Sequence, residues 1–302
     1  MADDRHVTIV EVGPRDGLQN EKGVISTDDK LSLIELLADA GISRIEATAF
    51  VSPKWVPQMA DHDAVMRRAT RRPGLTLSAL VPNEKGAVAA IAAGAQELAV
   101  FASASETFAI RNTNCTIAES IERFRPVLAL AKSHGLAVRG YVSCAVDCPY
   151  EGPIEPVAVS SVSDRLLEIG CFEIAVSDTL GRAIPARVDR MLFEVVKSTS
   201  ARQLACHFHD TSGLALANID IALRHGIRTF DSAAGGLGGC PYAPGAAGNV
   251  ATGLLAGHLT KNGYVHGIDR NRLVKAESAA RQLRVPDSLS HGASKLRQRI
   301  SS

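Results

Sequence analysis

The chain has 302 residues, 46% of them hydrophobic and 22% charged, and its 33 Lys and Arg residues nearly balance its 32 Asp and Glu residues. This is the composition of a globular protein. A net charge of +1 offers no basic surface for nucleic acid or for an anionic membrane. No apolar run reaches the ~20 residues of a membrane helix. The start, MADDRHVTIVEV, resembles neither a signal nor a transit peptide, so the cytoplasm is the expected compartment.

Eight short runs rich in β-branched residues alternate with longer stretches in which apolar residues recur every three or four positions. Strands are predicted at residues 7–12, 43–48, 75–81, 97–102, 136–142, 172–177, 203–209 and 228–233. Helices are predicted at 28–40, 58–70, 84–93, 117–134, 156–169, 186–199 and 213–225, with an eighth after 249. Five of these helices are followed by a glycine that predicts a left-handed end, namely Gly41, Gly94, Gly135, Gly170 and Gly226.

Alternating strands and helices favour a parallel sheet with right-handed crossovers. The count of eight, and the lack of a Gly-rich turn after the first strand, favour a closed (β/α)8 TIM barrel over an open doubly wound sheet. We therefore predict an α/β fold with a single catalytic domain over residues 1–302. The barrel is expected at about 5–265, a short C-terminal helical extension at about 266–290, and a frayed tail to 302.

Ionisable side chains occur at several of the predicted strand ends, where the catalytic groups of such barrels gather. They are Arg15, Asp16, Glu46, Asp178, His207 and His209. Glu46 lies in an apolar strand, where an unpaired carboxylate would be costly, and we expect Arg15 to be its partner. At the barrel mouth, the Arg15 guanidinium is suited to offset charge that develops on an oxyanion.

His207 and His209 are two positions apart on a predicted strand, so both project to one face. Asp16 would add a carboxylate and Asn249 a carbonyl oxygen. Such mixed nitrogen and oxygen ligands suit Mg²⁺, Mn²⁺ or another divalent ion. Two alternatives stay open: each histidine is a hydrogen-bonded core residue, and Asn249 is the N-cap of the following helix. Asp210 is expected to cap the helix after the seventh strand.

Residues 235–249 contain six glycines and one cysteine, Cys240. Because glycine disfavours regular structure, this segment predicts a long loop, and we expect a movable cover over the site. Cys240 is either a loop thiol without a task, a proton donor or a redox switch. Cys144 and Cys148 could form half of a zinc site, but no second pair accompanies them. Most of the six cysteines are therefore expected to be small buried residues.

Several stretches together resemble the 3-hydroxy-3-methylglutaryl-CoA lyase family. They include EVGPRDGLQNEK at 11–22, RGYVSCAVDCPYEG at 139–152, HFHDTSG at 207–213 and GGLGGCPYAPGAAGN at 235–249. The resemblance implies a TIM barrel that cleaves its acyl-CoA substrate to acetyl-CoA and acetoacetate with Mg²⁺ or Mn²⁺. It implies the metal ligands Asp16, His207, His209 and Asn249. It also implies catalytic or supporting roles for Arg15, Asp16, Glu46, Asp178, His207 and Cys240.

Gly253, Ser212 and Ala49 depart from the family pattern and suggest a longer acyl branch as an alternative substrate. A related Claisen condensing enzyme or aldolase is a second alternative, and a catalytically silent barrel that binds a partner is a third. Residues 82–83 and 103–106 are candidate walls of the CoA pocket. A homodimer is one arrangement that the sequence leaves open.

Overall fold

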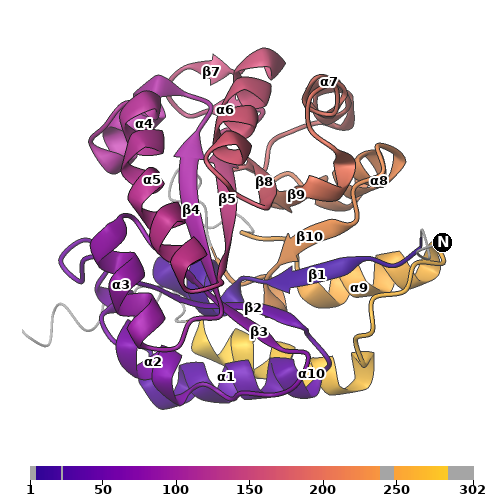
Figure 1. The fold of residues 1–302 in the computed structure, drawn as a ribbon. Helices are drawn as coiled ribbons and strands as arrows, with labels where there is room; N and C mark the ends of the chain where they lie inside the picture. Colours follow the sequence, from indigo (N-terminus) through magenta and orange to yellow (C-terminus); the bar gives the residue numbers. More distant parts are fainter. Residues whose placement is uncertain (1–4, 22, 239–247, 285–302) are drawn as a thin grey trace, which may run out of the picture.

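The computed structural model describes residues 5–21, 23–238 and 248–284. Eight parallel strands close into a barrel in the order β1-β10-β9-β8-β5-β4-β3-β2, which confirms the predicted TIM barrel (Figure 1). The barrel strands are β1 (Thr8–Glu11), β2 (Arg44–Ala49), β3 (Thr76–Leu80), β4 (Glu97–Ser103), β5 (Ala137–Ser143), β8 (Glu173–Asp178), β9 (Leu204–Phe208) and β10 (Thr229–Ser232). A small antiparallel hairpin, β6 (Asp147–Cys148) with β7 (Gly152–Pro153), follows β5.

Helices surround the barrel, and along the chain they lie between its strands (Figure 1). They are α1 (Thr27–Asp39), α2 (His62–Arg68), α3 (Glu84–Ala92), α4 (Glu106–Thr113), α5 (Ile117–Ser133), α6 (Pro156–Glu168), α7 (Pro185–Val195), α8 (Ala215–Arg224), α9 (Thr252–Lys261) and α10 (Arg270–Leu283). Short helical turns occur at η1 (Gly13–Gly17), η2 (Pro57–Met59), η3 (Ala201–Gln203) and η4 (Ala234–Gly236). The predicted helix at 58–70 is therefore divided between η2 and α2, and α4 was not predicted.

The apolar core lies between the strands and the helices, whereas the interior of the barrel carries an ionic network. Arg44 of β2 contacts Glu97 of β4 at 3.0 Å and Glu173 of β8 at 3.1 Å. Arg139 of β5 joins Glu173 at 2.7 Å to Asp231 of β10 at 2.7 Å. Because buried charges need partners, this chain of ion pairs lets charged side chains fill the barrel up to the ends of its strands.

The five glycines predicted to end helices all have positive φ, between 68° at Gly135 and 110° at Gly170. Helix α10 lies outside the barrel, beside α1, α9 and η4 (Figure 1). The domain limits stay a prediction, because residues 285–302 lie outside the described part of the chain.

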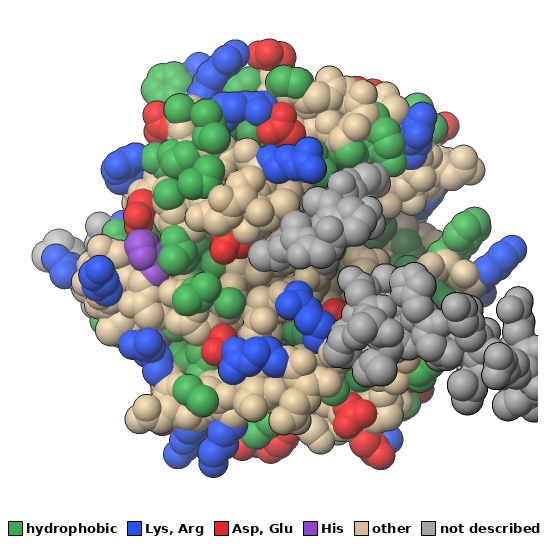
Figure 2. All heavy atoms as spheres, turned by 180° about the vertical axis from the view of Figure 1, so that it is seen from behind, with side chains coloured by type: hydrophobic (Ala, Val, Ile, Leu, Met, Phe, Trp, Pro, Cys, Tyr) green, Lys and Arg blue, Asp and Glu red, His purple; other side chains and the backbone are tan. Residues whose placement is uncertain are grey.

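On the face drawn in Figure 2, the coloured basic and acidic side chains are interspersed, as the net charge suggests. None of the described helices is long and apolar enough to span a bilayer.

Candidate active site

Glu11 fixes the turn that follows the first strand. Its Oε1 accepts hydrogen bonds from the backbone nitrogens of Gly13 at 2.8 Å and Ala234 at 2.9 Å. Its Oε2 accepts from the Thr252 hydroxyl at 2.6 Å. Burial raises the pKa of Glu11 to about 7, although these donors lower it and the charge of Glu277 adds to the rise. The η1 turn is thereby tied to η4 and to α9.

Arg15 lies in η1 with its guanidinium held between two carboxylates. Its Nε donates to Glu46 of β2, and its Nη1 donates to Asp16 at 2.6 Å. Tyr141 lies below, and its hydroxyl donates to the other Glu46 oxygen at 2.8 Å. Burial opposes the charge on Arg15, but the carboxylates of Glu46 and Asp16 raise its pKa above the usual range. The predicted pairing of Arg15 with Glu46 is confirmed.

Asp16, His207 and His209 form a compact group of possible metal ligands at the C-terminal mouth of the barrel. The Nε2 atoms of both histidines lie 3.8 Å from Asp16 Oδ2, too far for hydrogen bonds. Ligands bound about 2.1 Å from one ion lie roughly 3.0–4.2 Å apart, which includes this spacing. Burial alone would raise the pKa of Asp16, but Arg15 and the two imidazoles hold it well below its usual range.

The surroundings of the two imidazoles fit the same role. His207 Nδ1 lies 3.1 Å from Asp231 Oδ2, and an ionised carboxylate only accepts, so Nδ1 carries the proton and Nε2 presents its lone pair toward Asp16. Burial opposes the Asp231 charge, but Arg139 and His207 lower the pKa of Asp231 to about 2. His209 Nδ1 is buried without a hydrogen-bond partner among the described residues. The group therefore offers one imidazole nitrogen oriented by a hydrogen bond, on His207, a second imidazole, on His209, and one ionised carboxylate.

Asn249 lies beside this group, at the far end of the glycine-rich segment. Its side-chain nitrogen donates to Asp16 Oδ2 at 2.9 Å and to the Leu237 carbonyl at 3.3 Å. The alternative that Asn249 caps the next helix is wrong, because α9 begins at Thr252 with Ala251 as its N-cap. Asn249 precedes the N-cap by two residues, and its side chain turns into the barrel mouth instead.

Asp210 and Asp178 serve their own loops. Asp210 Oδ1 accepts from the backbone nitrogen of Ala215 at 3.0 Å, the first residue of α8, but the N-cap of this helix is Leu214 and not Asp210 as predicted. Asp178 Oδ1 accepts from Gly181 at 3.0 Å and Oδ2 from Ala183 at 2.8 Å. Burial raises the pKa of Asp178, against the two backbone donors and the nearby imidazole of His209. The catalytic role of Asp178 stays a prediction.

Cys240 and the central part of the expected cover, residues 239–247, lie outside the described residues. Five other cysteines, namely Cys115, Cys144, Cys148, Cys171 and Cys206, are free and buried, as predicted.

Four residues around the site were not singled out from the sequence, namely Glu11, Arg139, Tyr141 and Asp231. Arg139 and Tyr141 are two positions apart on β5, and both point into the barrel. A usable signal was present, since a polar residue at alternate positions of a predicted strand marks the inward face. What the sequence could not supply was the identity of each cross-barrel partner.

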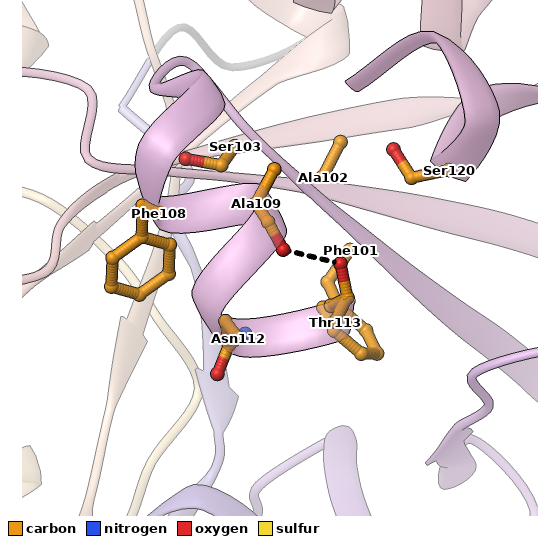
Figure 3. Close-up of a pocket in the computed structure, with 8 residues that line it drawn as sticks. All are labelled: Phe101, Ala102, Ser103, Phe108, Ala109, Asn112, Thr113 and Ser120. Carbon is orange, nitrogen blue, oxygen red and sulfur yellow. Dashed lines mark hydrogen bonds between the residues drawn. The ribbon is translucent and has the colours of Figure 1, made fainter. Parts of the chain in front are cut away.

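Two hollows in the structure lie away from the metal-ligand group. A cavity of about 10 Å³, large enough for one water molecule, lies at α4 and β4 and includes Ser103 and Thr113 (Figure 3). The dashed line marks the bond from the Thr113 hydroxyl to the Ala109 carbonyl. A larger hollow of about 590 Å³ lies at the opposite end of the barrel, where β5 begins after Gly135. Neither hollow is lined by Asp16, His207 or His209.

The chain is similar over most of its length to proteins of one family. A family model described as HMGL-like matches residues 6–279. The chain belongs to the HMGL-like family. It is 50% identical over 272 residues to the mitochondrial hydroxymethylglutaryl-CoA lyase of Macaca fascicularis, covering 90% of this chain and 84% of that protein. It is 51% identical over 271 residues to the cytoplasmic 3-hydroxy-3-methylglutaryl-CoA lyase of Danio rerio, covering 90% and 81%.

Solved structures of HMGL-like proteins superpose closely on this one. The HMG-CoA lyase of Brucella melitensis matches with a TM-score of 0.92 and 54% identity, over 93% of this chain and 99% of that one. The HMG-CoA lyase of Acinetobacter baumannii, solved in complex with coenzyme A and 3-methylmalate, matches with a TM-score of 0.88 and 38% identity. That match covers 94% of this chain and 92% of the other.

Proposed function

We propose that this protein is a divalent-metal-dependent lyase that cleaves 3-hydroxy-3-methylglutaryl-CoA to acetyl-CoA and acetoacetate. The observation that carries the proposal is the convergence of Asp16, His207 and His209 at the barrel mouth. This group occurs in a chain that is about half identical to proteins named as such lyases over nine-tenths of its length. Coenzyme A in the Acinetobacter structure supports an acyl-CoA substrate.

Asp16, His207 and His209 would hold the ion, with Mg²⁺ and Mn²⁺ as the expected ions for such a mixed set. Asn249 would join them if a half turn of its amide group brought the oxygen, in place of the nitrogen, toward Asp16. When bound, a divalent ion acidifies the tertiary hydroxyl of the substrate and neutralises its free carboxylate. The remaining steps fall to side chains of the protein.

Cleavage begins with loss of the hydroxyl proton to a base, either Asp16 or a water molecule at the site. The hydroxyl oxygen then becomes the ketone oxygen of acetoacetate, the adjacent C–C bond breaks, and its electron pair passes to the acetyl thioester as an enolate. Arg15 is held rigidly by Glu46 and Asp16, and its guanidinium would stabilise the enolate oxygen. Because this charge develops only during cleavage, Arg15 would favour the transition state over the bound substrate.

The enolate carbon must then gain a proton to become acetyl-CoA. Nδ1 of His207 is bonded to Asp231 and its Nε2 would bind the ion, which leaves His207 poorly placed as an acid. This favours Cys240, the other candidate, as the proton donor. A thiol has an ordinary pKa of about 8.5 and is protonated at neutral pH, as the step requires.

The acyl branch that the site accepts is a separate question, because a metal group and an arginine do not select a methyl over a longer chain. Thioesters of 3-hydroxy-3-alkylglutarate with branches of rising length would locate the limit. We expect the methyl substrate to give the highest kcat/KM, and a maximum at a longer branch would support the alternative substrate.

Assays of the reverse condensation would test the synthase alternative. The cytoplasmic compartment and the homodimer stay predictions.

The proposed function is tested by acetoacetate release before and after treatment with EDTA, followed by addition of Mg²⁺ or Mn²⁺. We expect activity to vanish with the chelator and to return with either ion. His207→Ala should lose at least about 100-fold in kcat/KM, whereas the matched control His134→Ala, on the exposed end of α5, should keep wild-type activity. Undiminished turnover in EDTA, or in His207→Ala, would rule out the metal assignment.

A further inference from the structure

Helix α10 lies against the start of the glycine-rich segment rather than against the barrel strands. Gly235, in η4, has a φ of +64°, and a Cβ there would lie 3.1 Å from both the Arg281 side chain and the Glu277 carbonyl. The two backbones therefore approach so closely that a side chain at position 235 would have to push α10 slightly away. This close approach lets polar groups of α10 reach the backbone of η4 and α9.

Two charged side chains make these contacts. Arg284, immediately after α10, donates from Nη2 to the carbonyls of Gly236 at 3.1 Å and Gly238 at 3.2 Å. Glu277 accepts from the backbone nitrogen of Gly253 at 2.8 Å, in the first turn of α9. A cation on backbone carbonyls and an anion at a helix N-terminus are both favourable placements. A Cβ at position 253 would lie 2.6 Å from the Glu277 carboxylate, so a side chain there would displace the end of Glu277 from this contact.

The backbone that Arg284 holds is the backbone against which Asn249 packs. The Leu237 carbonyl, between the two carbonyls bound by Arg284, accepts from Asn249 at 3.3 Å. A Cβ at Gly238 would lie 2.8 Å from the same Asn249 nitrogen. On its other side, Leu237 is so close to Gly17 that a Cβ there would lie 2.7 Å from Leu237 Cβ. The segment 236–238 is thus wedged between the η1 turn and Asn249.

We propose that Arg284 and Glu277 are positioning residues for the metal site. Arg284 fixes residues 236–238, Glu277 fixes the start of α9, and Asn249 lies between these two anchored points. Asn249 is thereby kept 2.9 Å from Asp16. Neither Arg284 nor Glu277 touches the metal-ligand group, so both act through the backbone that they hold. The inference rests on the proposed function, because it assumes that Asp16 and Asn249 serve a bound ion.

The test is a calorimetric titration of the metal-free protein with Mn²⁺. Arg284→Gln should weaken Mn²⁺ binding roughly tenfold, the lower end of the effect of indirect partners of metal ligands. Arg284→Lys, which keeps one charged donor, should recover most of the affinity. Glu277→Ala should also weaken binding. Lys275→Gln, an exposed change on the same helix, is the matched control and should bind as the wild type does.

A purely structural role for Arg284 makes a different prediction, namely a lower Tm with unchanged metal affinity. That result, or Mn²⁺ affinity within twofold of the control in Arg284→Gln, would overturn the inference. A second readout is the Mn²⁺ dependence of kcat: saturating Mn²⁺ should restore kcat in Arg284→Gln, because the ligands themselves are intact. Failure of the wild-type protein to bind Mn²⁺ would instead overturn the proposed function, and the inference with it.

Discussion

Asp231 illustrates how a residue outside the metal-ligand group can decide the chemistry of a site. Its carboxylate accepts from His207 at 3.1 Å and from Arg139 at 2.7 Å and 3.0 Å, and it is almost fully buried. Arg139 keeps Asp231 ionised, and an ionised Asp231 keeps the proton of His207 on Nδ1. The second nitrogen of His207 is then free to bind a cation.

Replacing Asp231 with asparagine should therefore weaken metal binding while leaving the shape of the interior nearly unchanged. We expect Asp231→Asn to lower Mn²⁺ affinity roughly 10- to 100-fold, measured by titration calorimetry. The matched control is Asp220→Asn, which disturbs another Asp–His pair, at 2.6 Å to His258 on the outside of the barrel. Equal Mn²⁺ affinities for the two variants would show that the orientation of His207 does not depend on Asp231.

The loops after β8 and β9 interlock at one glycine. Gly181 has a φ of +63°, and a Cβ there would lie 2.6 Å from the Thr211 hydroxyl and 2.9 Å from the carbonyl carbon of His209. The Gly181 carbonyl also accepts from Ser212 at 2.9 Å. The loop that Asp178 organises thus fixes the position of the loop that follows His209.

Alanine at position 181 should consequently destabilise the protein and displace His209. A left-handed φ alone costs about 1–2 kcal/mol for a residue with a Cβ, and we expect the backbone clash to add roughly 2 kcal/mol. Gly213→Ala separates the two effects, because Gly213 has a φ of +69° and open space around its Cβ position. Urea unfolding of the metal-free variants measures both. Equal losses in the two variants would contradict the predicted clash.

The helices and strands that the sequence predicted well are those whose apolar residues recur at a regular spacing. The eight strands and the helices that end at a glycine were predicted from local signals. These signals are runs of β-branched residues, amphipathic stretches, and glycines such as Gly41 that follow a helix. Helix α4 has only eight residues and no long apolar stripe, so it was missed. The η1 turn depends on the Glu11 contacts to Ala234 and Thr252, more than 200 residues away, and no local pattern encodes such contacts.

For the site, the residue types predicted which side chains meet at the barrel mouth better than they predicted the partner of each side chain. The two-residue spacing of His207 and His209 and the Arg15–Glu46 pair followed from strand geometry and from the cost of a buried charge. The Asp231 contact did not, because any of several carboxylates inside the barrel could have reached His207. Competing cross-barrel pairings can be decided only once the strand order and register are fixed.

On the scale of the whole molecule, buried carboxylates make stability depend on pH. Glu11 has a pKa of about 7 in the folded protein against an ordinary value of 4.5, because burial disfavours its charge. The folded state therefore binds more protons between these values, and stability falls as the pH rises from about 4.5 through 7. The contribution of Glu11 is fully present below about 4.5, and its loss over this window is about 3 kcal/mol.

The variant Glu11→Gln removes this titration and should flatten the corresponding part of the pH profile. We expect the difference in unfolding free energy between wild type and Glu11→Gln to change steadily from pH 5 to pH 8, in the direction of a relatively less stable wild type at high pH. Denaturant unfolding at several pH values measures it. A constant difference across this range would mean that Glu11 is ionised throughout.

The strand order of the barrel brings residues 16, 207 and 209 together, and the proposed reaction depends on one ion at that place. The most direct measurement is anomalous X-ray scattering from crystals of the protein grown with Mn²⁺. We predict a single strong anomalous peak at the barrel mouth, about 2.1 Å from Asp16 Oδ2 and from Nε2 of both His207 and His209. A peak elsewhere, or none at a Mn²⁺ concentration that supports activity, would contradict the account.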